Sequence, residues 1–347
     1  MLASLLVAVV ATSAAPAVPA AQSIPQVPRL ASPAGAAVGV PANDDGPLFA
    51  SPTRLDRIGR IVVPVMINGM GPFRFIIDSG ASHSTMTPRL AAALGLDPAT
   101  QQTMRVNGIT GTADVPSVAV DRLQAGSLEI RDKRFPVVFA PVLGDVDGIL
   151  GVAGLKKELI SIDFQHDRVT IFPSHRRGAP SGFQTVAAER VEGGLLAVPG
   201  RIGRVHVLAI IDTGSERTLG NPVLREALQS RRKKKPTTAA STVVYGATTE
   251  TSEGFMEDSP PIVLDQIVIS RVAIIFGDFH IFDVWNLKDQ PAIIIGMDVI
   301  GTLRALAIDF KDSKLYFDGG ARDASEGPAR PDQPGNRQMA QPPRPAS

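Results

Sequence analysis

Two short acidic motifs in this sequence combine residue types and a spacing that could do chemistry. Asp78-Ser79-Gly80-Ala81 follows the apolar run Phe75-Ile76-Ile77, and Asp212-Thr213-Gly214-Ser215 follows Ala209-Ile210-Ile211. One Asp-Gly turn at the end of a strand is usually only a turn. Two such turns, in register with a longer repeat, favour a joint role for their carboxyl groups.

Two carboxyl groups that face each other can activate a water molecule. The ionised group takes a proton from the water, while the protonated group polarises the carbonyl oxygen of the substrate. Because two like charges about 3 Å apart resist joint ionisation, the pair holds a single proton over a range of pH. We therefore expect peptide-bond hydrolysis by Asp78 and Asp212, with no cofactor and no metal.

The residues that follow each aspartate are suited to hold such a pair. Gly80 and Gly214 permit tight turns and bring backbone N–H groups close to each carboxylate. Ser79 and Thr213 each supply a hydroxyl group that could tie the two turns together. We predict a supporting role for these four residues.

The elements that must position the motifs also occur twice. The same spacing that separates the two aspartates separates the predicted helices 88–94 and 222–228, each of which starts with proline. Further along, Gly148-Ile149-Leu150-Gly151 resembles Ile293-Ile294-Ile295-Gly296. A sequence that repeats in the same order over about 100 residues indicates two similar structural units.

Short β-branched and aromatic runs with turn signals between them indicate strands. We expect strands at 61–67, 73–77, 115–120, 127–130 and 135–139 in the first copy, and at 205–211, 262–269 and 272–276 in the second. Residues 68–72, Asn-Gly-Met-Gly-Pro, predict a hairpin turn. This order of short strands, turns and short helices, which occurs twice, predicts an all-β fold with two lobes and short helices.

The two ends of the chain differ from this pattern. Residues 1–22 resemble a secretory signal peptide, although no Lys or Arg precedes the apolar run; a disordered Ala/Pro leader is the alternative. We expect a disordered linker at 23–51, an N-terminal lobe at 52–178, a C-terminal lobe at 179–318 and a disordered tail at 319–347. Export predicts a periplasmic or secreted protein with no stable membrane insertion after signal removal.

The composition narrows the possible functions. The sequence of 347 residues has no cysteine, which excludes disulfides, thiolate metal sites and cysteine nucleophiles. The formal net charge of +1 gives no strong field that would attract nucleic acid. We expect a peptide or protein substrate as the partner, no nucleic acid, and a monomer.

Several other polar groups have an ordinary interpretation. None of the five histidines has metal-ligand spacing, and His83, five residues after Asp78, is the one worth testing. The basic run 231–235 is interpreted as a solvated loop, with a proteolytic nick site or contact with an anionic surface as alternatives. The acids Glu250, Glu253, Glu257 and Asp258 predict a solvated loop or, alternatively, a cleft that prefers basic peptides.

The two motifs and the two apolar-Gly segments resemble the aspartic proteases, and in particular the bacterial retropepsin-like group. The resemblance covers about residues 52–318, and two motifs in one chain look like a fused pair that builds its own site. It implies the acid protease fold and glycine-rich hairpin flaps over the substrate. Residues 106–111 and 243–248 occupy the flap positions, with Gly108, Ile109, Tyr245 and Gly246 as predicted substrate contacts.

The resemblance implies an aspartic endopeptidase, and two other hypotheses stay open. A peptide-binding clamp could keep the fold without turnover, and a structural protein could pair with partners through sheet edges. Glu216-Arg217, which replace Ser82-His83 of the first copy, could alter the floor of the site. Trp285 is expected in the core.

Overall fold

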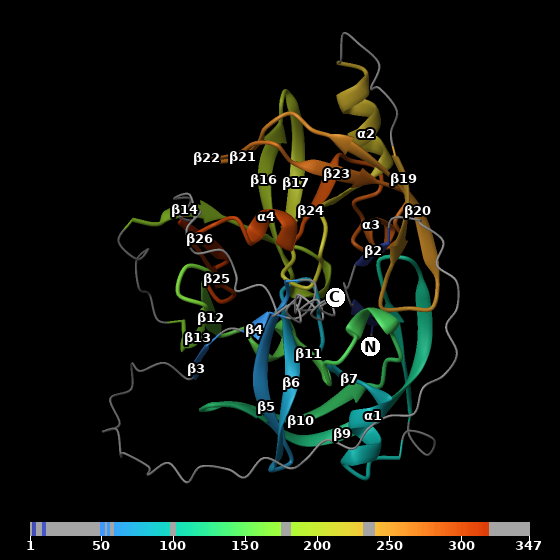
Figure 1. Ribbon diagram of the computed structural model, residues 1–347, viewed down its shortest axis with the longest axis vertical. Helices are drawn as coiled ribbons and strands as arrows, with labels where there is room; N and C mark the ends of the chain where they lie inside the picture. The colour runs from blue at the N-terminus through green and yellow to red at the C-terminus, as the bar shows by residue number, and fades with distance from the viewer. Residues whose placement is uncertain are drawn as a thin grey trace, which may run out of the picture.

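The computed structural model describes residues 2–4, 9–11, 49–52, 54–55, 59–97, 102–174, 182–231 and 240–318. These residues form mostly strands with a few short helices, arranged as two lobes (Figure 1). Strands of the first repeat, coloured blue to green, build the lower lobe, and those of the second, yellow to orange, build the upper lobe. The all-β, two-lobed fold predicted from the sequence is confirmed.

The first lobe is built around a hairpin that leads directly to Asp78. Strands β5 (Ile61–Ile67) and β6 (Met70–Asp78) are antiparallel and are joined by Asn68 and Gly69, which both have positive φ. Two consecutive residues of that conformation form the tight turn that matches the twist of a hairpin. The other elements of this lobe are β4 (Arg54–Leu55), β7 (Thr85–Met86), α1 (Pro88–Ala93), β8 (Thr103–Asn107), β9 (Thr112–Ala125), β10 (Leu128–Pro136), η2 (Pro141–Leu143), β11 (Gly148–Gly151) and η3 (Val152–Gly154).

The second lobe repeats this plan around Asp212. Strand β16 (Leu196–Ile202) pairs with β17 (Val205–Ile211), which ends one residue before the aspartate. The remaining elements are β15 (Glu189–Arg190), η4 (Glu192–Gly194), β18 (Leu219–Gly220), α2 (Pro222–Gln229), β19 (Ala240–Tyr245), β20 (Thr251–Asp258), β21 (Ile262–Leu264), β22 (Ile267–Ile269), β23 (Ala273–Phe276), α3 (His280–Val284), β24 (Ala292–Ile295) and α4 (Met297–Ile300).

A six-stranded sheet joins the two lobes. Its order is β14 (Gln184–Ala187), β26 (Lys314–Asp318), β25 (Ala305–Asp309), β12 (Glu158–Asp163), β13 (Arg168–Pro173) and β3 (Phe49–Pro52). At its centre, β12 and β25 are antiparallel, with Ile160 opposite Ile308, so corresponding strands of the two repeats meet. Because both isoleucines are buried, the repeats share one core at this junction.

Helices α1 and α2 start in the same way. The side chains of Thr87 and Asn221 accept hydrogen bonds from the N–H groups of Leu90 and Leu224, and proline follows each cap. Such caps satisfy N–H groups that have no partner inside the helix. Both helices confirm the prediction from the sequence, although α2 extends one residue further than expected.

Some strands differ from their predicted bounds. The two strands expected at 127–130 and 135–139 are a single strand, β10, which ends at Pro136, and Phe139 is exposed. The run 262–269 divides into β21 and β22 at Asp265, whose positive φ turns the chain. The short helices α3 and α4 have no counterpart in the sequence expectations. Trp285 is buried, as predicted.

Strands also occur near the N-terminus. Leu2–Ser4 (β1) and Val9–Ala11 (β2) lie in the segment expected to be a signal peptide, and β3 includes residues 49–51 of the expected linker. The linker is therefore shorter at its C-terminal end than expected. The other residues of the segments 1–22, 23–51 and 319–347, apart from β1, β2 and β3, lie outside the described residues. Among the described helices, none is both long and apolar enough to span a membrane.

Candidate active site

The structure brings the two Asp-Ser/Thr-Gly turns together at the junction between the lobes. Asp78 and Asp212 are fully buried. A Cβ atom added to Gly80 would lie 2.6 Å from Cγ of Asp212, and one added to Gly214 would lie 2.2 Å from Cγ of Asp78. Each glycine therefore packs its Cα against the carboxyl group of the other lobe. No side chain larger than hydrogen fits in either place.

Four hydrogen bonds cross between the turns. The N–H of Ser79 donates to Oγ1 of Thr213 at 3.0 Å, and the N–H of Thr213 donates to Oγ of Ser79 at 3.0 Å. The hydroxyl groups then donate to carbonyl oxygens in the opposite lobe: Ser79 to Ile211 at 2.7 Å, and Thr213 to Ile77 at 2.8 Å. The hydroxyl groups of Ser79 and Thr213 link the two turns, as the sequence suggested, and they fix the position of the two lobes relative to each other.

Each carboxyl group is held by the backbone that follows it. The N–H of Gly80 donates to Oδ1 of Asp78 at 2.8 Å, and the N–H of Gly214 donates to Oδ1 of Asp212 at 2.8 Å. Asp212 receives a further bond from the N–H of Ser215, at 3.2 Å. Apart from the contact between the carboxyl groups, Oδ2 of each aspartate is buried with no hydrogen-bond partner among the described residues. A buried carboxyl oxygen without a partner is costly, so each of these two atoms needs a functional explanation.

Burial raises the pKa of both carboxyl groups. For Asp78 the pKa lies well above its ordinary value, first because of burial and then because of the charge of Asp212 and a hydrogen bond between the two carboxyl groups. Burial raises the pKa of Asp212 to about 7, opposed by hydrogen bonds from Gly214, Asp78 and Ser215. Asp212 accepts one more backbone hydrogen bond than Asp78, which favours the negative charge of the pair on Asp212.

A second strand supports each turn from the side. Strand β11 runs parallel to β6 with Gly151 opposite Asp78, and β24 runs parallel to β17. A Cβ on Gly151 would lie 2.5 Å from the carbonyl of His83, and one on Gly296 would lie 2.6 Å from the carbonyl of Arg217. The two apolar-Gly segments found in the sequence therefore pass directly beneath the loops that follow the aspartates.

Two hairpins have the positions expected of flaps. The first joins β8 to β9 and the second joins β19 to β20. They meet at their tips, where Oγ1 of Thr110 lies 3.2 Å from Oγ1 of Thr248. Of the predicted substrate contacts, Gly108, Ile109 and Gly246 are buried at these tips, and Tyr245 is 38% exposed. Their contact with substrate stays a prediction.

An extended segment of the chain already pairs with both flaps. Strand β1 is parallel to β8, with Ala3 opposite Val106, and β2 is antiparallel to β19, with Val10 opposite Val244. In Figure 1, β2 lies beside β19 and β20. The flap strands therefore have backbone edges that pair with extended strands, which is the way an extended peptide forms sheet hydrogen bonds.

The other sequence candidates are placed around this site. His83 is partly buried, its Nδ1 lies 2.9 Å from Oγ of Ser82, and burial lowers its pKa. Glu216 and Arg217 form an ion pair with each other, and Arg217 is exposed. The N–H groups of Val152 and Met297 bond to Ala81 and Ser215 beneath the loops.

The acids after the second flap do not form one solvated loop. Glu257 is buried and binds Arg225 and Gln229, whereas Glu253 is exposed and binds Ser241. The prediction of a loop is wrong for Glu253, Glu257 and Asp258, because these acids lie on strand β20. The prediction of solvation is also wrong for Glu257, because its buried carboxylate neutralises an arginine on α2. In the basic run, Arg231 bonds to the carbonyl of Arg204 and residues 232–235 lie outside the described part.

Sequence reasoning missed Arg60. This arginine directly precedes β5, is 2% exposed, and its charge lowers the pKa of both Asp78 and Asp212. The signal that could have found it is the pairing of the predicted hairpin. If Val62 lies opposite Ile76, then position 60 lies opposite Asp78.

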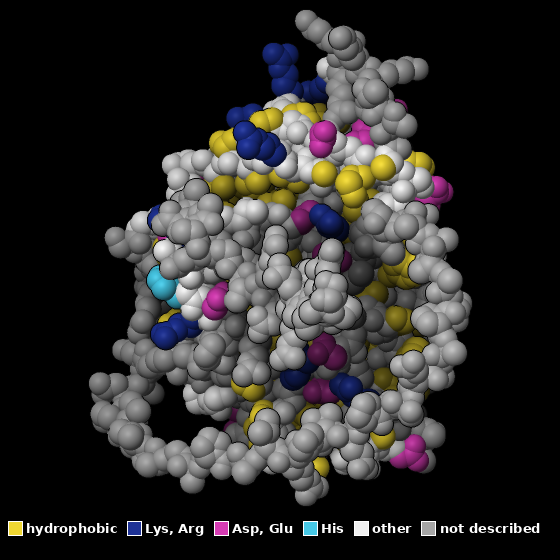
Figure 2. Space-filling view, in the orientation of Figure 1, with side chains coloured by type: hydrophobic (Ala, Val, Ile, Leu, Met, Phe, Trp, Pro, Cys, Tyr) yellow, Lys and Arg dark blue, Asp and Glu magenta, His cyan; other side chains and the backbone are white. Residues whose placement is uncertain are grey.

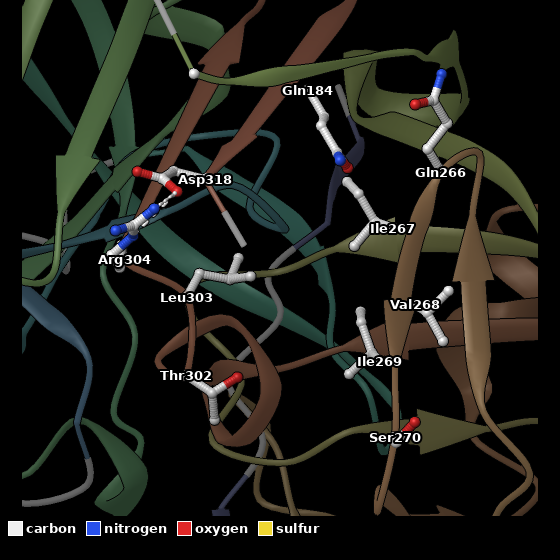
Figure 3. A pocket seen from close by; sticks show the side chains of 11 residues that line it. Gln184, Gln266, Ile267, Val268, Ile269, Ser270, Thr302, Leu303, Arg304 and Asp318 are labelled. Atoms are coloured by element: carbon white, nitrogen blue, oxygen red, sulfur yellow. Dashed lines mark hydrogen bonds and ion pairs between the residues drawn. The ribbon is translucent and has the colours of Figure 1, made fainter. Parts of the chain in front are cut away.

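A pocket of about 440 Å³ lies elsewhere, between strand β22 and the edge of the six-stranded sheet (Figure 3). Ile267, Val268 and Ile269 come from one strand, and the ion pair between Arg304 and Asp318 lies across from them. None of the predicted site residues lines it. On the face of the molecule in Figure 2, acidic and basic side chains are interspersed, as the small net charge suggests.

The comparisons with known proteins agree with this geometry. A family model described as aspartyl protease matches residues 63–153 and again residues 198–299. The two matches fall on the two lobes, and each includes one Asp-Ser/Thr-Gly turn and one apolar-Gly strand. No curated protein matches the chain. Two matches that together span more than half of the sequence show that this chain belongs to the aspartyl protease family, as a single chain with two fused repeats.

Proposed function

We propose that the protein is an aspartic endopeptidase in which Asp78 and Asp212 activate a water molecule between them. Membership of the family supports a protease-type function. The observation that carries the proposal is the mutual packing of each glycine against the carboxyl group of the opposite lobe. This packing brings two buried carboxyl groups together, which is the arrangement that general acid and base catalysis by a carboxyl pair requires.

The different surroundings of the two aspartates divide the roles. Because Asp212 accepts two backbone hydrogen bonds, its anion is better stabilised, and it takes the proton from the water. Asp78, which accepts a single backbone hydrogen bond and whose pKa is raised by burial, keeps its proton and donates a hydrogen bond to the substrate's carbonyl oxygen. When the water attacks the carbonyl carbon, that proton neutralises the developing oxyanion. As the C–N bond breaks, Asp212 passes the proton taken from water to the leaving nitrogen, and a hydroxyl group of the tetrahedral intermediate returns a proton to Asp78.

The flap strands supply the binding mode for this reaction. The pairing of β1 and β2 with the flaps supports a substrate that lies extended and forms backbone hydrogen bonds on both sides. Binding of this kind holds the scissile bond against the dyad with little dependence on side chains. We also propose, from the sequence alone, that the protein works as a monomer in the periplasm or outside the cell.

The alternative is a peptide-binding clamp with the same fold and no turnover. Hydrolysis of a mixed peptide library, followed by mass spectrometry from pH 3 to pH 8, separates the two. The proposal expects cleavage by the wild type and a loss of at least about 1,000-fold in the Asp212→Asn and Asp78→Asn variants. Asp121→Asn, which alters an exposed carboxylate outside the site, is the matched control and should cleave like the wild type.

A second measurement keeps binding apart from cleavage. A peptide analogue with a non-hydrolysable hydroxyl group in place of the scissile carbonyl should bind the wild type and bind the Asn variants more weakly. If the wild type binds peptides and cleaves none at any pH, the clamp is the correct function. If the Asn variants cleave as fast as the wild type, the dyad is not the source of activity.

A further inference from the structure

The two repeats differ at one position directly beside the dyad. In β5 and β6, Val62 lies opposite Ile76, and this register continued by two residues places Arg60 opposite Asp78. In β16 and β17, Ala197 lies opposite Ile210, and the same continuation places Leu195 opposite Asp212. Side chains of directly opposite residues stand on the same face of a sheet. The first lobe therefore presents a cation beside its aspartate where the second presents a hydrocarbon.

Arg60 is fixed in this place. Its side chain is 2% exposed, and Leu195 is fully buried, so both positions belong to the interior. Nη2 of Arg60 donates a hydrogen bond of 2.9 Å to the carbonyl oxygen of Val142, in η2. An arginine has several strong donors and is almost never buried without an anion nearby. A buried guanidinium group next to two buried carboxyl groups gives the interior a compensating charge.

The other buried acids have partners of their own. Glu257 binds Arg225 at 2.7 Å, and Asp309 accepts a hydrogen bond from Ser174 at 2.7 Å. The remaining buried carboxyl groups in the described part of the chain are Asp78 and Asp212. Because a low-dielectric interior strengthens charge interactions, one cation at this place acts on both members of the pair. Its charge opposes burial in the pKa of each aspartate.

Other charged groups on the elements packed around the dyad are differently placed. His83 follows Asp78 on its loop, Glu216 and Arg217 follow Asp212 and pair with each other, and Asp298 on α4 binds Thr218. Among these groups, Arg60 is the one whose charge acts on the pKa of both aspartates.

We propose that Arg60 is a positioning residue that keeps one negative charge on the Asp78–Asp212 pair and so sets the acidic limit of the enzyme's working range. The inference rests on the proposed function, because it concerns the protonation state that hydrolysis requires. A pair that carries one charge needs a cation nearby when burial favours the neutral form. The guanidinium group supplies it from one side only, since the second lobe has leucine at the matching position.

The test compares three variants by the pH dependence of kcat/KM between pH 3 and pH 8. Arg60→Met keeps length without charge, Arg60→Leu copies the second lobe, and Arg60→Lys keeps a cation. We expect the acidic limb of the profile to move upward by about one pH unit or more in the Met and Leu variants, and by less in the Lys variant. Leu195→Met, at the matching place, should leave the limb where it is in the wild type.

A readout that does not depend on turnover separates this inference from the proposed function. The carboxyl groups of Asp78 and Asp212 can be titrated by NMR of protein labelled with ¹³C at aspartate, and Arg60→Met should raise their first titration step. If the wild type cleaves nothing but the titration moves, the proposed function fails and the charge effect stands. If Arg60→Met folds, as judged by circular dichroism, and its titration matches the wild type, Arg60 is merely structural.

Discussion

Around Asp78 and around Asp212 the backbone repeats itself closely. In each lobe a buried strand ends at or just before the aspartate, a glycine N–H donates to Oδ1 at 2.8 Å, and a parallel apolar-Gly strand passes beside the turn. The charged surroundings are not repeated. Asp212 has the added N–H of Ser215, and Asp78 has Arg60 opposite where Asp212 has Leu195. A symmetric scaffold therefore places the two acids, and asymmetric electrostatics gives them different tasks.

The symmetric part of this comparison predicts the largest effect. Gly80→Ala and Gly214→Ala should each reduce kcat/KM at least about 100-fold, because a Cβ within 2.6 Å of the opposite carboxyl carbon forces the turns apart. The carboxyl groups cannot yield, since backbone N–H groups hold them. Peptide hydrolysis by purified, folded variants is the measurement.

Gly95→Ala is the matched control for that pair. Gly95 has a φ of +68° but no atom within 4 Å of an added Cβ, so alanine there strains the backbone without touching the site. It should lower the free energy of unfolding by about 1 kcal/mol and leave kcat/KM unchanged. Full activity in the Gly80→Ala or Gly214→Ala variant would mean that the turns do not meet as described.

The next effect concerns the pH dependence of stability, which reports how burial perturbs the two carboxyl groups. Both carboxyl groups have a pKa in the folded protein above the ordinary value of 3.8. A group of this kind supports folding fully below about pH 4 and loses that contribution as the pH rises toward its folded pKa. Between pH 4 and pH 7 the wild type should therefore lose thermal stability relative to Asp78→Asn and Asp212→Asn.

The difference in Tm between each variant and the wild type should grow across that range, because burial raises the pKa of both carboxyl groups. Differential scanning calorimetry at pH 4, 5, 6, 7 and 8 measures it. Asp121→Asn, at an exposed position, should show a Tm difference that does not depend on pH in this way. A constant difference for the dyad variants would show that burial does not perturb the two carboxyl groups.

Much of the scaffold could be predicted from sequence because its signals are local. Asn68-Gly69 specifies a tight hairpin, alternating β-branched residues specify β5 and β17, and a cap followed by proline begins α1 and α2. The dyad could be predicted because the repeat supplied a second copy of the motif. These features depend on neighbours in the chain and survive any error in long-range placement.

The missed features depend on distant partners. In the sequence, Arg60 is a polar residue that precedes a predicted strand. Its burial follows from packing against η2 and the dyad. In the sequence, Glu257 is one of several acids between positions 250 and 258. Its burial follows from the ion pair with Arg225 on α2. The pairing of β1 and β2 with the flaps joins residues that are about 100 and more than 200 positions apart. Apart from the hairpin register that places position 60 opposite Asp78, sequence patterns carry no local signal for such contacts.

The flaps allow a test of intermediate size. Strand β1 pairs in parallel with the first flap and β2 pairs antiparallel with the second, so each of these short strands covers the edge of one flap. A chain that lacks residues 1–22 should show kcat/KM about ten-fold higher than the full chain, because substrate no longer competes for these edges. A synthetic peptide of residues 1–11 should inhibit the shortened chain competitively, whereas the same residues in scrambled order should inhibit less. Equal activity of both chains, with no inhibition by the peptide, would contradict this expectation.

The smallest expected effect distinguishes the two flaps from each other. Oγ1 of Thr112, next to the turn of the first flap, donates to Oδ1 of Asn107 at 2.8 Å, so Nε2–H of His280 on α3 must donate to Thr112 across 2.7 Å. This bond joins the first flap to the opposite lobe. A hydrogen bond of this partly buried kind contributes about 1 kcal/mol, so His280→Ala should raise KM about five-fold with little change in kcat. Ser241→Ala removes an exposed bond to Glu253 on the second flap and should leave KM unchanged. If both variants raise KM equally, the interlobe bond has no special part in placing the flap. If His280→Ala lowers kcat instead, the bond acts on the dyad. A flap that only positions substrate would change binding first.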